Sequence, residues 1–376
     1  MTGLDALSRD GFAPLRGKRV GLVTHPAALS GTLRSAAELF AERTNLVALF
    51  GPEHGFTGEA QDLIPVAGSA SAIPVHSLYG DTFESLKPTP DMLAGLDVLA
   101  IDLVDVGSRY YTFQATMLYC LEACAEAGVP VVVLDRPNPI GHAVEGPTVR
   151  PGFASFVGAH PIATRHGLTI GELARLYRTE RAPNVDLRVI PCDAHATVDR
   201  FLLPPSPNMP TVATAIVYPG MCLVEGTNLS EGRGTTRPFE YVGFPGIDPR
   251  RLAERLNADR LPDVRFLPVT FRPTFQKHAG QSCGGVFVAP TGEAFQPVRT
   301  GLAVLIAFRD LLGDRFRWRT ERYEFVEHIP AIDLLFGSDR ERTMIDAGAG
   351  WRDIAKLWEP EEAAFRERSA AYHTAR

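Results

Sequence analysis

An acid and an imidazole stand side by side in the segment GPEHG (51–55), directly after an apolar run that predicts a buried strand. Pro52 fixes its own φ angle and the glycines on either side permit tight turning, so Glu53 is expected on a stiff turn. A carboxyl group that is partly shielded from water keeps its proton more readily, which suits a general acid working near neutral pH. Glu53 and His54 are therefore the first candidate catalytic residues. The structural alternative is that Glu53 caps the next segment while His54 packs beneath it.

Polar side chains also follow the next two predicted strands. In DVGSRYYT (105–112) an arginine offers a planar fork for a carboxylate, and two tyrosines offer flat faces for a sugar ring. An arginine paired with a neighbouring aspartate is the alternative. The stiff turn DRPNP (135–139) adds groups that could hold an N-acetyl or hydroxyl group, or simply staple the turn. The candidate binding residues from these strand ends are Asp102, Asp105, Arg109, Tyr110, Tyr111, Arg136 and Asn138.

A glycine-rich segment, EGTNLSEGRGTTRPFE (225–240), carries many donors and acceptors. Its glycines let the backbone approach a ligand closely, and its polar side chains suit a polyhydroxylated substrate, although a solvated surface loop could have the same composition. Glu225 and Glu231 are its candidate catalytic carboxylates. Two other segments, LPPSPNMP (203–210) and FQKHAG (275–280), add to the site. The candidate binding residues from all three segments are Asn208, Asn228, Arg233, Thr235, Thr236, Arg237 and His278.

Several familiar chemistries lack their signature in this sequence. The first strand–helix turn, THPAALSG (24–31), has no GxGxxG, and no GxxxxGK[ST] occurs, so nucleotide binding is disfavoured. The histidines are scattered without HExxH or Cys/His ligand spacing, so no metal and no cofactor is expected. A GxSxG elbow is absent as well, which argues against a serine nucleophile.

The 376 residues carry a formal net charge of −6 and 45% hydrophobic residues. This balance is ordinary for a globular protein and argues against nucleic acid or an anionic membrane as the main partner. The five cysteines show no CxxC spacing, so reduced, buried thiols are expected. No basic start followed by an apolar stretch opens the chain, which predicts a cytoplasmic protein unless a leader was trimmed. The alternating arginines at positions 315, 317, 319 and 322 are interpreted as the solvated face of a strand.

The elements that must position these residues alternate between strands and helices over the first half of the chain. Apolar runs that end in polar residues predict the strands, and amphipathic segments predict the helices. Such alternation favours an α/β fold with a parallel sheet covered on both faces, and such sheets bind ligands at the carboxyl ends of their strands. Strands are predicted at 18–26, 45–50, 97–107, 129–139 and 185–192, and helices at 32–43, 90–96, 116–128 and 172–180.

The pattern changes after the proline-dense segment 201–210, which is interpreted as a connector laid over the surface or along a cleft. The long segment 218–246 then shows little periodicity, and a loop of this length inside a compact protein is usually functional or disordered. Its Tyr, Phe and Leu content argues against disorder. The remainder predicts a smaller α+β domain, with helices at 248–260 and 299–313 and a strand at 284–290. The expected domains are residues 1–220 and 221–376.

Seven segments resemble, in order, the exo-β-N-acetylmuramidase (NamZ-type) family. They are LFGPEHGFTG, DLVDVGSRYYT, VVLDRPNPIG, RHGLTIGELA, LPPSPNMP, YPGMCLVEGTNLSEGRGTTRPFE and FQKHAGQSCGGV. The resemblance implies a Rossmann-like N-terminal domain without a nucleotide, a smaller C-terminal domain and an active cleft between them. It also implies release of terminal N-acetylmuramic acid (MurNAc) from the non-reducing end of peptidoglycan fragments, in cell-wall turnover or salvage. The glutamate of the PEHG motif, here Glu53, is implied as the catalytic acid.

The implied substrate agrees with the residue types. MurNAc carries a lactyl carboxylate, which calls for a cation, and the candidates are Arg109, Arg136 and Arg237. The second carboxylate of a glycosidase is open among Asp102, Asp105, Glu225 and Glu231, and the 2-acetamido oxygen of the sugar could attack in its place. A hexosaminidase for another 2-acetamido sugar and a non-catalytic muropeptide-binding protein are the alternatives. The expected ligand is a muropeptide or a MurNAc-containing disaccharide, and the sequence leaves the oligomeric state open.

Overall fold

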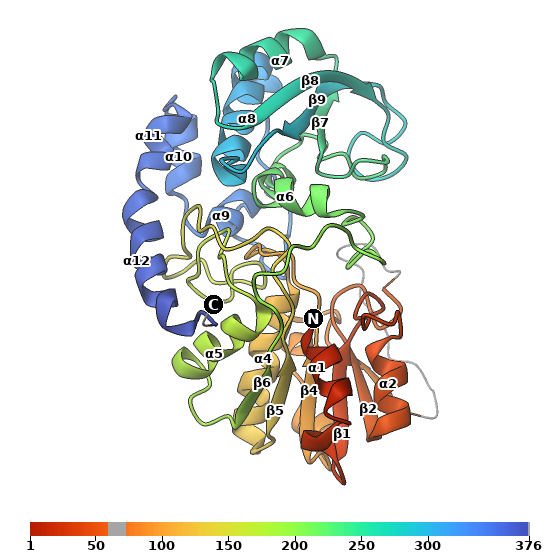
Figure 1. The fold of residues 1–376 in the computed structure, drawn as a ribbon. Coiled ribbons are helices and arrows are strands. Elements are labelled where there is room, and N and C mark those ends of the chain that lie inside the picture. Colours follow the sequence, from red (N-terminus) through yellow and green to blue (C-terminus); the bar gives the residue numbers. More distant parts are fainter. Residues whose placement is uncertain (59–72, 375–376) are drawn as a thin grey trace.

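A parallel sheet forms the core of the N-terminal half in the computed structural model, which describes residues 1–58 and 73–374 (Figure 1). Its strands lie in the order β3-β2-β1-β4-β5-β6, and all neighbours pair in parallel. The order reverses between β1 and β4, as in Rossmann-like folds. The predicted α/β fold is therefore confirmed. The strands are β1 (Arg19–Thr24), β2 (Asn45–Gly51), β3 (Val75–Ser77), β4 (Val98–Asp102), β5 (Val131–Leu134) and β6 (Leu187–Ile190).

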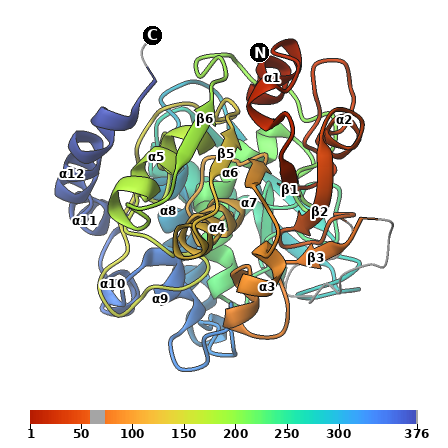
Figure 2. The same cartoon turned by 90° about the horizontal axis from the view of Figure 1, so that it is seen from below.

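Helices cover both faces of this sheet (Figure 2). On one face Val98 and Ala100 of β4 share a buried cluster with Leu4 of α1 and with residues of α2. On the other face Leu99 and Ile101 of β4 pack with residues of α4 and α5. Successive residues of a strand point to opposite faces, so a wholly apolar strand is buried from both sides. These helices are α1 (Gly3–Arg9), α2 (Ala36–Arg43), α3 (Pro90–Leu93), α4 (Phe113–Ala127) and α5 (Ile170–Glu180).

Short polar motifs set the boundaries of these helices. The hydroxyl group of Thr169 accepts a hydrogen bond from the N–H of Glu172, whose carboxylate accepts one from the N–H of Thr169, so the two residues form a capping box at the start of α5. Ser35 and Glu38 form the same reciprocal pair at the start of α2. α4 ends at Gly128, whose φ of 68° lies in the left-handed region that favours glycine.

The C-terminal half contains an antiparallel sheet in the order β7-β9-β8, with helices packed beside it (Figure 1). The helices predicted at 248–260 and 299–313 and the strand predicted at 284–290 are confirmed to within a few residues. The expected domain boundary near residue 220 falls within α6 and stays a prediction. The elements of this half are β7 (Tyr241–Pro245), β8 (Val264–Phe271), β9 (Cys283–Pro290), α6 (Val212–Met221), α7 (Pro249–Ala258), α8 (Pro297–Leu312), α9 (Ala331–Phe336), α10 (Arg340–Asp346), α11 (Trp351–Lys356) and α12 (Glu359–Ser369).

α12 carries the end of the chain back to the N-terminal half. Oε1 of Glu362 accepts a hydrogen bond of 2.8 Å from the N–H of Gly146 and forms an ion pair of 2.8 Å with Arg299 of α8. Beyond the helix, the N–H of Thr374 donates to Glu172 of α5 at 2.6 Å. α12 therefore ties the two halves together, and Figure 1 shows it running down to α5.

One predicted strand is absent. The segment that carries the arginines at 315, 317, 319 and 322 begins in the 3₁₀ turn Gly313–Arg315 and continues as an irregular backbone with an isolated bridge between Thr227 and Trp318. Phe316 and Trp318 contact each other edge to face, and Tyr323 is buried. The alternation of arginine with aromatic residues therefore belongs to a half-buried loop and not to the solvated face of a strand.

The cysteines lie where buried, reduced thiols were expected. All five cysteines are free and buried, and Cys120 and Cys124 lie in the core on α4, as predicted for reduced thiols. Within residues 1–58 and 73–374, no helix combines the length and the apolar character that crossing a membrane requires.

Candidate active site

Glu53 lies in a tight turn that follows the carboxyl end of β2. The turn uses backbone angles that favour glycine: His54 has φ 71° and Gly55 has φ 79°, and a Cβ atom on Gly51 would lie 2.5 Å from the backbone of the same turn. The Glu53 side chain is buried, with 6% exposure. Its Oε2 accepts a hydrogen bond of 2.6 Å from the hydroxyl group of Thr112, which precedes α4. The turn and this bond together fix one oxygen of the carboxyl group.

Glu225 lies on the 3₁₀ turn Cys222–Gly226, directly after α6. Its Oε1 accepts a hydrogen bond of 2.6 Å from Arg233, and its Oε2 accepts one of 2.9 Å from the hydroxyl group of Tyr323. Burial alone would raise the pKa of Glu225, but the charges of Arg233 and Lys277 and the tyrosine hydroxyl lower it below its ordinary value of 4.5. Glu225 is therefore an ionised carboxylate at neutral pH with both oxygens oriented.

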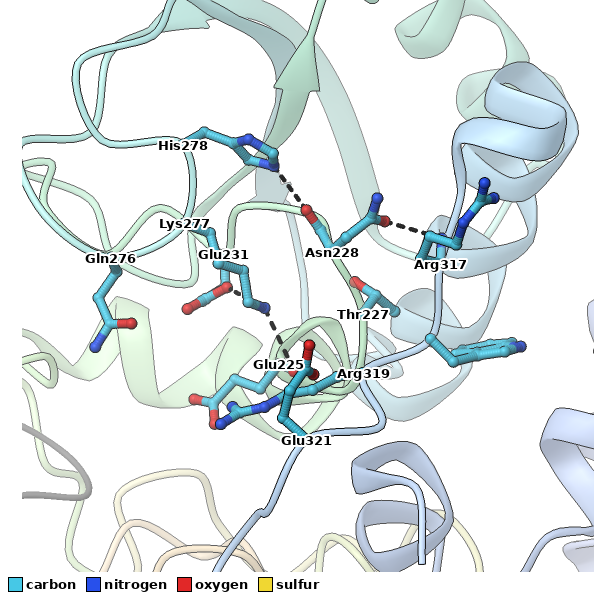
Figure 3. A pocket seen from close by; sticks show the side chains of 11 residues that line it. Glu225, Thr227, Asn228, Glu231, Gln276, Lys277, His278, Arg317, Arg319 and Glu321 are labelled. Atoms are coloured by element: carbon cyan, nitrogen blue, oxygen red, sulfur yellow. Dashed lines mark hydrogen bonds and ion pairs between the residues drawn. The ribbon is translucent and has the colours of Figure 1, made fainter.

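Glu231 belongs to the same charge network. Nζ of Lys277 lies 3.0 Å from its Oε2, and Nε of Arg233 lies 3.5 Å from its Oε1. Lys277 also donates a hydrogen bond of 3.1 Å to the carbonyl oxygen of Val224. Figure 3 shows Lys277 and Glu231 pointing toward one another. Arg233 thus touches both glutamates, and its guanidinium group holds the two carboxylates together.

Two cavities adjoin at Glu225. The smaller one, about 40 Å³, is lined by Glu53 from the N-terminal half and by Glu225, Arg233 and Tyr323 from the C-terminal half. The larger one, about 540 Å³, is also lined by Glu225 and includes Glu231 (Figure 3). Because Glu225 lines both, a ligand in the larger cavity would lie next to the residues of the smaller one.

The sequence-predicted residues divide between the cavities and the surrounding scaffold. Those at the smaller cavity are Glu53, His54, Tyr110, Tyr111, Asn208, Glu225 and Arg233, and those at the larger cavity are Glu225, Asn228, Glu231 and His278. The wall of the larger cavity is fixed at Asn228, whose Oδ1 accepts a hydrogen bond of 3.0 Å from the N–H of Arg317. Its backbone oxygen lies 2.7 Å from Nε2 of His278.

Asp102 and Arg136 pair with each other and line neither of these cavities. Nε and Nη2 of Arg136 donate to the two oxygens of Asp102 at 2.6 and 2.9 Å, and the same guanidinium group donates to the carbonyl oxygen of Leu29 at 3.2 Å. This bidentate pair occupies the fork of Arg136. The structure therefore places Arg136 and Asp102 outside the two cavities, where the pair joins the ends of β4 and β5.

Arg109 also lies outside both cavities. Its guanidinium group has no solvent exposure and donates to the carbonyl oxygens of Pro147 at 2.6 Å, Ile162 at 3.2 Å and Leu335 at 2.5 Å. Burial lowers the pKa of Arg109 below its ordinary range. The side chain ties two loops to α9 from inside the protein, so its donors are engaged by the fold.

Asp105 and Asn138 also turn toward the scaffold. Oδ2 of Asp105 accepts a hydrogen bond of 2.7 Å from the backbone of its own turn and lies 3.3 Å from Nε2 of His166. Asn138 accepts a hydrogen bond from the N–H of Ile140 and donates one to the carbonyl oxygen of Leu168, both at 3.0 Å. Neither residue lines the two cavities. Asn138 therefore stabilises the turn 135–139 by hydrogen bonds to the backbone, which is the structural alternative considered for this turn.

Thr235, Thr236 and Arg237 lie beyond the cavities on the same glycine-rich segment. The hydroxyl group of Thr235 donates to the carbonyl oxygen of Gly232 at 2.6 Å, and Arg237 pairs with Glu240 at 3.0 Å. Thr236 and Arg237 are exposed. These three residues shape the loop and its surface, so the structure does not bring them to the site.

Two residues that hold the candidate carboxylates were not selected from the sequence. Thr112 follows the SRYY motif and donates a hydrogen bond to Glu53. Its position before a helix is the one feature of the local sequence that could have drawn attention to its hydroxyl group. Tyr323 contacts Glu225 from the segment that had been interpreted as a strand face. Trp318 and Arg319 of that segment line the larger cavity as well. Nothing in the local sequence indicates which loop these side chains meet.

Histidines away from the cavities are engaged by the fold. Nε2 of His25 accepts a hydrogen bond of 3.0 Å from the N–H of Val104, and burial, with a nearby arginine, lowers the pKa of His25 to about 3.

Possible metal ligands gather at His142, Glu172 and His373, whose ligand atoms lie within 4.8 Å of one another. Both ring nitrogens of His142 lie against backbone carbonyl oxygens, and Glu172 caps α5. The cap and the carbonyl contacts account for this group without an ion.

Two family models match nearly the whole chain. Residues 20–213 match "Exo-beta-N-acetylmuramidase NamZ, N-terminal", and residues 216–374 match "Exo-beta-N-acetylmuramidase NamZ, C-terminal". The chain belongs to the NamZ family. The family predicted from the seven sequence segments is thereby confirmed.

One named relative and two crystal structures match this chain over nearly its whole length. A Bacillus subtilis (strain 168) protein named peptidoglycan beta-N-acetylmuramidase NamZ is 43% identical, covering 99% of this chain and 90% of that protein. Two crystal structures of DUF1343 family proteins from Bacteroides fragilis share the fold. One has a TM-score of 0.88 and 31% identity, covering 100% of this chain and 98% of that chain. The other has a TM-score of 0.77 and 30% identity, covering 99% and 98%.

The candidate site contains two carboxyl groups in unlike surroundings. Glu53 has one oxygen fixed by a neutral hydroxyl group, whereas Glu225 is held ionised by two cations and a tyrosine. A proton donor opposite an ionised carboxylate is the arrangement with which most glycosidases cleave a glycosidic bond. The candidate site brings together two carboxyl groups, the number that such a reaction uses.

Proposed function

We propose that this protein is an exo-acting glycoside hydrolase that releases β-linked MurNAc from the non-reducing end of peptidoglycan fragments. The observation that carries the proposal is that the buried side chains of Glu53 and Glu225, from opposite halves of the chain, line one small cavity. Membership of the NamZ family and a relative named as a peptidoglycan muramidase support this choice of sugar. A muropeptide or a MurNAc-containing disaccharide from cell-wall turnover or salvage is the proposed substrate.

In this proposal Glu53 donates a proton to the glycosidic oxygen as the bond breaks. Because Thr112 donates its hydrogen bond to Oε2, the proton belongs on Oε1, and no described residue donates a hydrogen bond to that oxygen. Oε1 can therefore point its proton at a leaving group. His54 lines the same cavity and forms its wall beside the acid.

Glu225 is the proposed second carboxylate. Positive charge develops on the sugar ring in the transition state, and an ionised carboxylate beside the anomeric carbon stabilises it. The same negative charge serves whether Glu225 attacks that carbon or orients the 2-acetamido group that does. Glu231 contributes indirectly, because it holds Arg233 and Lys277 against Glu225.

The sugar ring is placed in the larger cavity. A water molecule needs about 10–15 Å³ by the same kind of measure. The smaller cavity of about 40 Å³ therefore has room for the reacting atoms and a few waters, but not for a sugar ring. The larger cavity of about 540 Å³ accepts a sugar residue, and Glu225 forms the wall that both share. This placement presents the anomeric carbon to Glu225 and the glycosidic oxygen toward Glu53.

The test is hydrolysis of para-nitrophenyl β-N-acetylmuramide and of a MurNAc-containing disaccharide, with para-nitrophenyl β-N-acetylglucosaminide as the control sugar. We expect the wild type to release product from both muramides and Glu53→Gln to lose about a thousandfold or more on the disaccharide. Glu240→Gln is the matched control, because Glu240 is buried on the same segment as Glu225 but outside both cavities. That variant should keep the wild-type rate.

Other outcomes would redirect the proposal. Equal hydrolysis of the glucosaminide and the muramide would indicate a hexosaminidase for 2-acetamido sugars in general. Binding of the disaccharide without hydrolysis would indicate a muropeptide-binding protein. Full activity of Glu53→Gln on the disaccharide would remove Glu53 from the catalytic role, whichever sugar is preferred.

A further inference from the structure

The larger cavity contains cations of two kinds. Lys277 lines it and is held by Glu231 at 3.0 Å, and Arg233 of the adjoining smaller cavity is held by Glu225 at 2.6 Å. Arg317 and Arg319 also line the cavity, and in the described part of the chain neither forms an ion pair with a carboxylate. The first pair orients the candidate carboxylates, whereas the second pair has its charge available.

Arg319 is the arginine that approaches the reaction centre. Its backbone N–H donates a hydrogen bond of 2.9 Å to the carbonyl oxygen of Gly226, the neighbour of Glu225. Its guanidinium carbon lies 5.0 Å from the centre of the Tyr323 ring, and the hydroxyl group of that ring contacts Glu225. Figure 3 shows the side chains of Arg319 and Glu225 running in the same direction, while Arg317 points away from them.

The other bonds of Arg319 leave its guanidinium fork accessible. Nη2 donates a single long hydrogen bond of 3.4 Å to the carbonyl oxygen of Arg322. Glu321 shares the rim of the cavity, but among the described residues no ion pair joins it to Arg319. The side chain is half-buried, so solvent screens its charge less than on an open surface. A carboxylate that enters the cavity can therefore engage it.

We propose that Arg319 binds the lactyl carboxylate of the terminal MurNAc and so determines the preference of this site for muramides. The proposal rests on the proposed function. The three arginines that the sequence suggested for this role are committed to Asp102, to buried carbonyl oxygens and to Glu240. The lactyl group is attached to C3 of the same ring whose C1 faces Glu225. A cation beside Glu225 is thus within one sugar ring of the bond that breaks.

The physical basis is a charge-assisted hydrogen bond that a glucosaminide cannot form. An N-acetylglucosaminide has a hydroxyl group at C3, which leaves the guanidinium group without its anion while the rest of the sugar is bound. A site that is built to bind a polar group discriminates against analogues that lack it. Esterification of the lactyl carboxylate removes the same charge and leaves the sugar, the linkage and the leaving group unchanged.

The experiment compares kcat/KM for para-nitrophenyl β-N-acetylmuramide and for its lactyl methyl ester, in the wild type and in Arg319→Gln. We expect the wild type to prefer the free acid over the ester by about 30-fold, in keeping with the range for charged hydrogen bonds. Arg319→Gln should lose about 30-fold on the acid, little on the ester, and most of the preference between them. The matched control is Arg322→Gln, since Arg322 lies on the same segment and is exposed outside both cavities. This variant should keep the wild-type preference.

The outcomes separate this inference from the proposed function. An undiminished preference for the acid in Arg319→Gln would overturn the role of Arg319 even if the enzyme is a muramidase. An equal loss on acid and ester would overturn it too, because it would show damage to Glu225 instead of loss of an anion contact. If the wild type hydrolyses neither compound, calorimetric binding of N-acetylmuramic acid and its methyl ester to the same variants gives the same comparison.

Discussion

The hydroxyl group of Thr112 lies 2.6 Å from Oε2 of Glu53 and donates to it, so the two oxygens of that carboxyl group are not equivalent. A neutral carboxylic acid keeps its proton on the oxygen that is not accepting such a bond. In the proposed mechanism, the direction of the Thr112 bond therefore selects Oε1 as the atom that would carry the proton. Loss of the hydroxyl group would let the acid rotate and present the wrong oxygen to the substrate.

We expect Thr112→Val to lower kcat on a MurNAc-containing disaccharide by about 10- to 100-fold, because valine keeps the shape of threonine without the donor. The loss should be smaller on the para-nitrophenyl glycoside, whose reactive leaving group needs less protonation. Thr112→Ser should restore most of the rate. Steady-state rates on both substrates check this dependence on the leaving group.

Thr116→Val provides the matched control for that substitution. Thr116 lies on α4 and is fully buried, but its hydroxyl group forms no hydrogen bond with any described residue. The same change there removes no contact to Glu53. A loss of rate in Thr116→Val as large as in Thr112→Val would show that packing of the helix, and not the bond to Glu53, is responsible.

The central strands of the sheet could be predicted because they are buried on both faces. The run predicted as a strand at 45–50 is β2, Asn45–Gly51, to within one residue. Burial from both sides requires an uninterrupted apolar run, and such a run stands out from one sequence. β3 was not predicted, because it has three half-buried residues, Val75–Ser77, and no such run. Its position is set by pairing with β2, which is not a local property.

The candidate site could be predicted only in part, for a related reason. Residue types were enough to select Glu53, Glu225 and Glu231 as candidate catalytic residues. The role of a polar side chain, however, depends on the groups that contact it in the fold. An arginine has the same guanidinium fork whether it binds a substrate or the protein itself. Here Arg109 binds buried carbonyl oxygens, and one of them belongs to Leu335, far away in the sequence. Likewise, Arg319 alternates with aromatic residues as a strand residue would. Its role depends on contacts with Tyr323 and with the backbone beside Glu225.

The depressed pKa of Glu225 makes the stability of the protein depend on pH in a defined direction. The pKa of Glu225 in the folded state lies below the ordinary value of 4.5 that applies to the unfolded chain. Its contribution to stability is therefore fully present above about pH 4.5 and is lost as the pH falls through the folded-state pKa. Glu225→Gln has no such contribution to lose.

We expect Glu225→Gln to lower the free energy of unfolding by on the order of 3 kcal/mol at pH 7, because it breaks a buried ion pair with Arg233. The difference from the wild type should shrink as the pH falls below about 4.5. Urea unfolding of both proteins at a series of pH values measures it. Glu254→Gln, an exposed position on α7, serves as the control and should match the wild type throughout. A difference that stays constant down to acid pH would contradict the ionised state assigned to Glu225.

The helix that leads into Glu225 is positioned by a contact between two glycines. A Cβ atom on Gly220 of α6 would lie 1.8 Å from the carbonyl oxygen of Pro297, and one on Gly301 of α8 would lie 2.2 Å from the carbonyl oxygen of Gly220. Real Cβ atoms do not approach backbone this closely, so α6 and α8 would have to separate. Since the 3₁₀ turn with Glu225 directly follows α6, the separation would reach the site.

We expect Gly220→Ala to destabilise the protein by about 3 kcal/mol, at the upper end of the range for overpacking, and to lower kcat as Glu225 shifts. Gly350→Ala is the control, because a Cβ atom there would meet nothing closer than 3.6 Å. It should change the free energy of unfolding by less than about 1 kcal/mol. Urea unfolding, together with hydrolysis rates under conditions where each variant is fully folded, separates the two effects. Wild-type stability in Gly220→Ala would mean that the helices do not pack as closely as the Gly220–Gly301 contact requires.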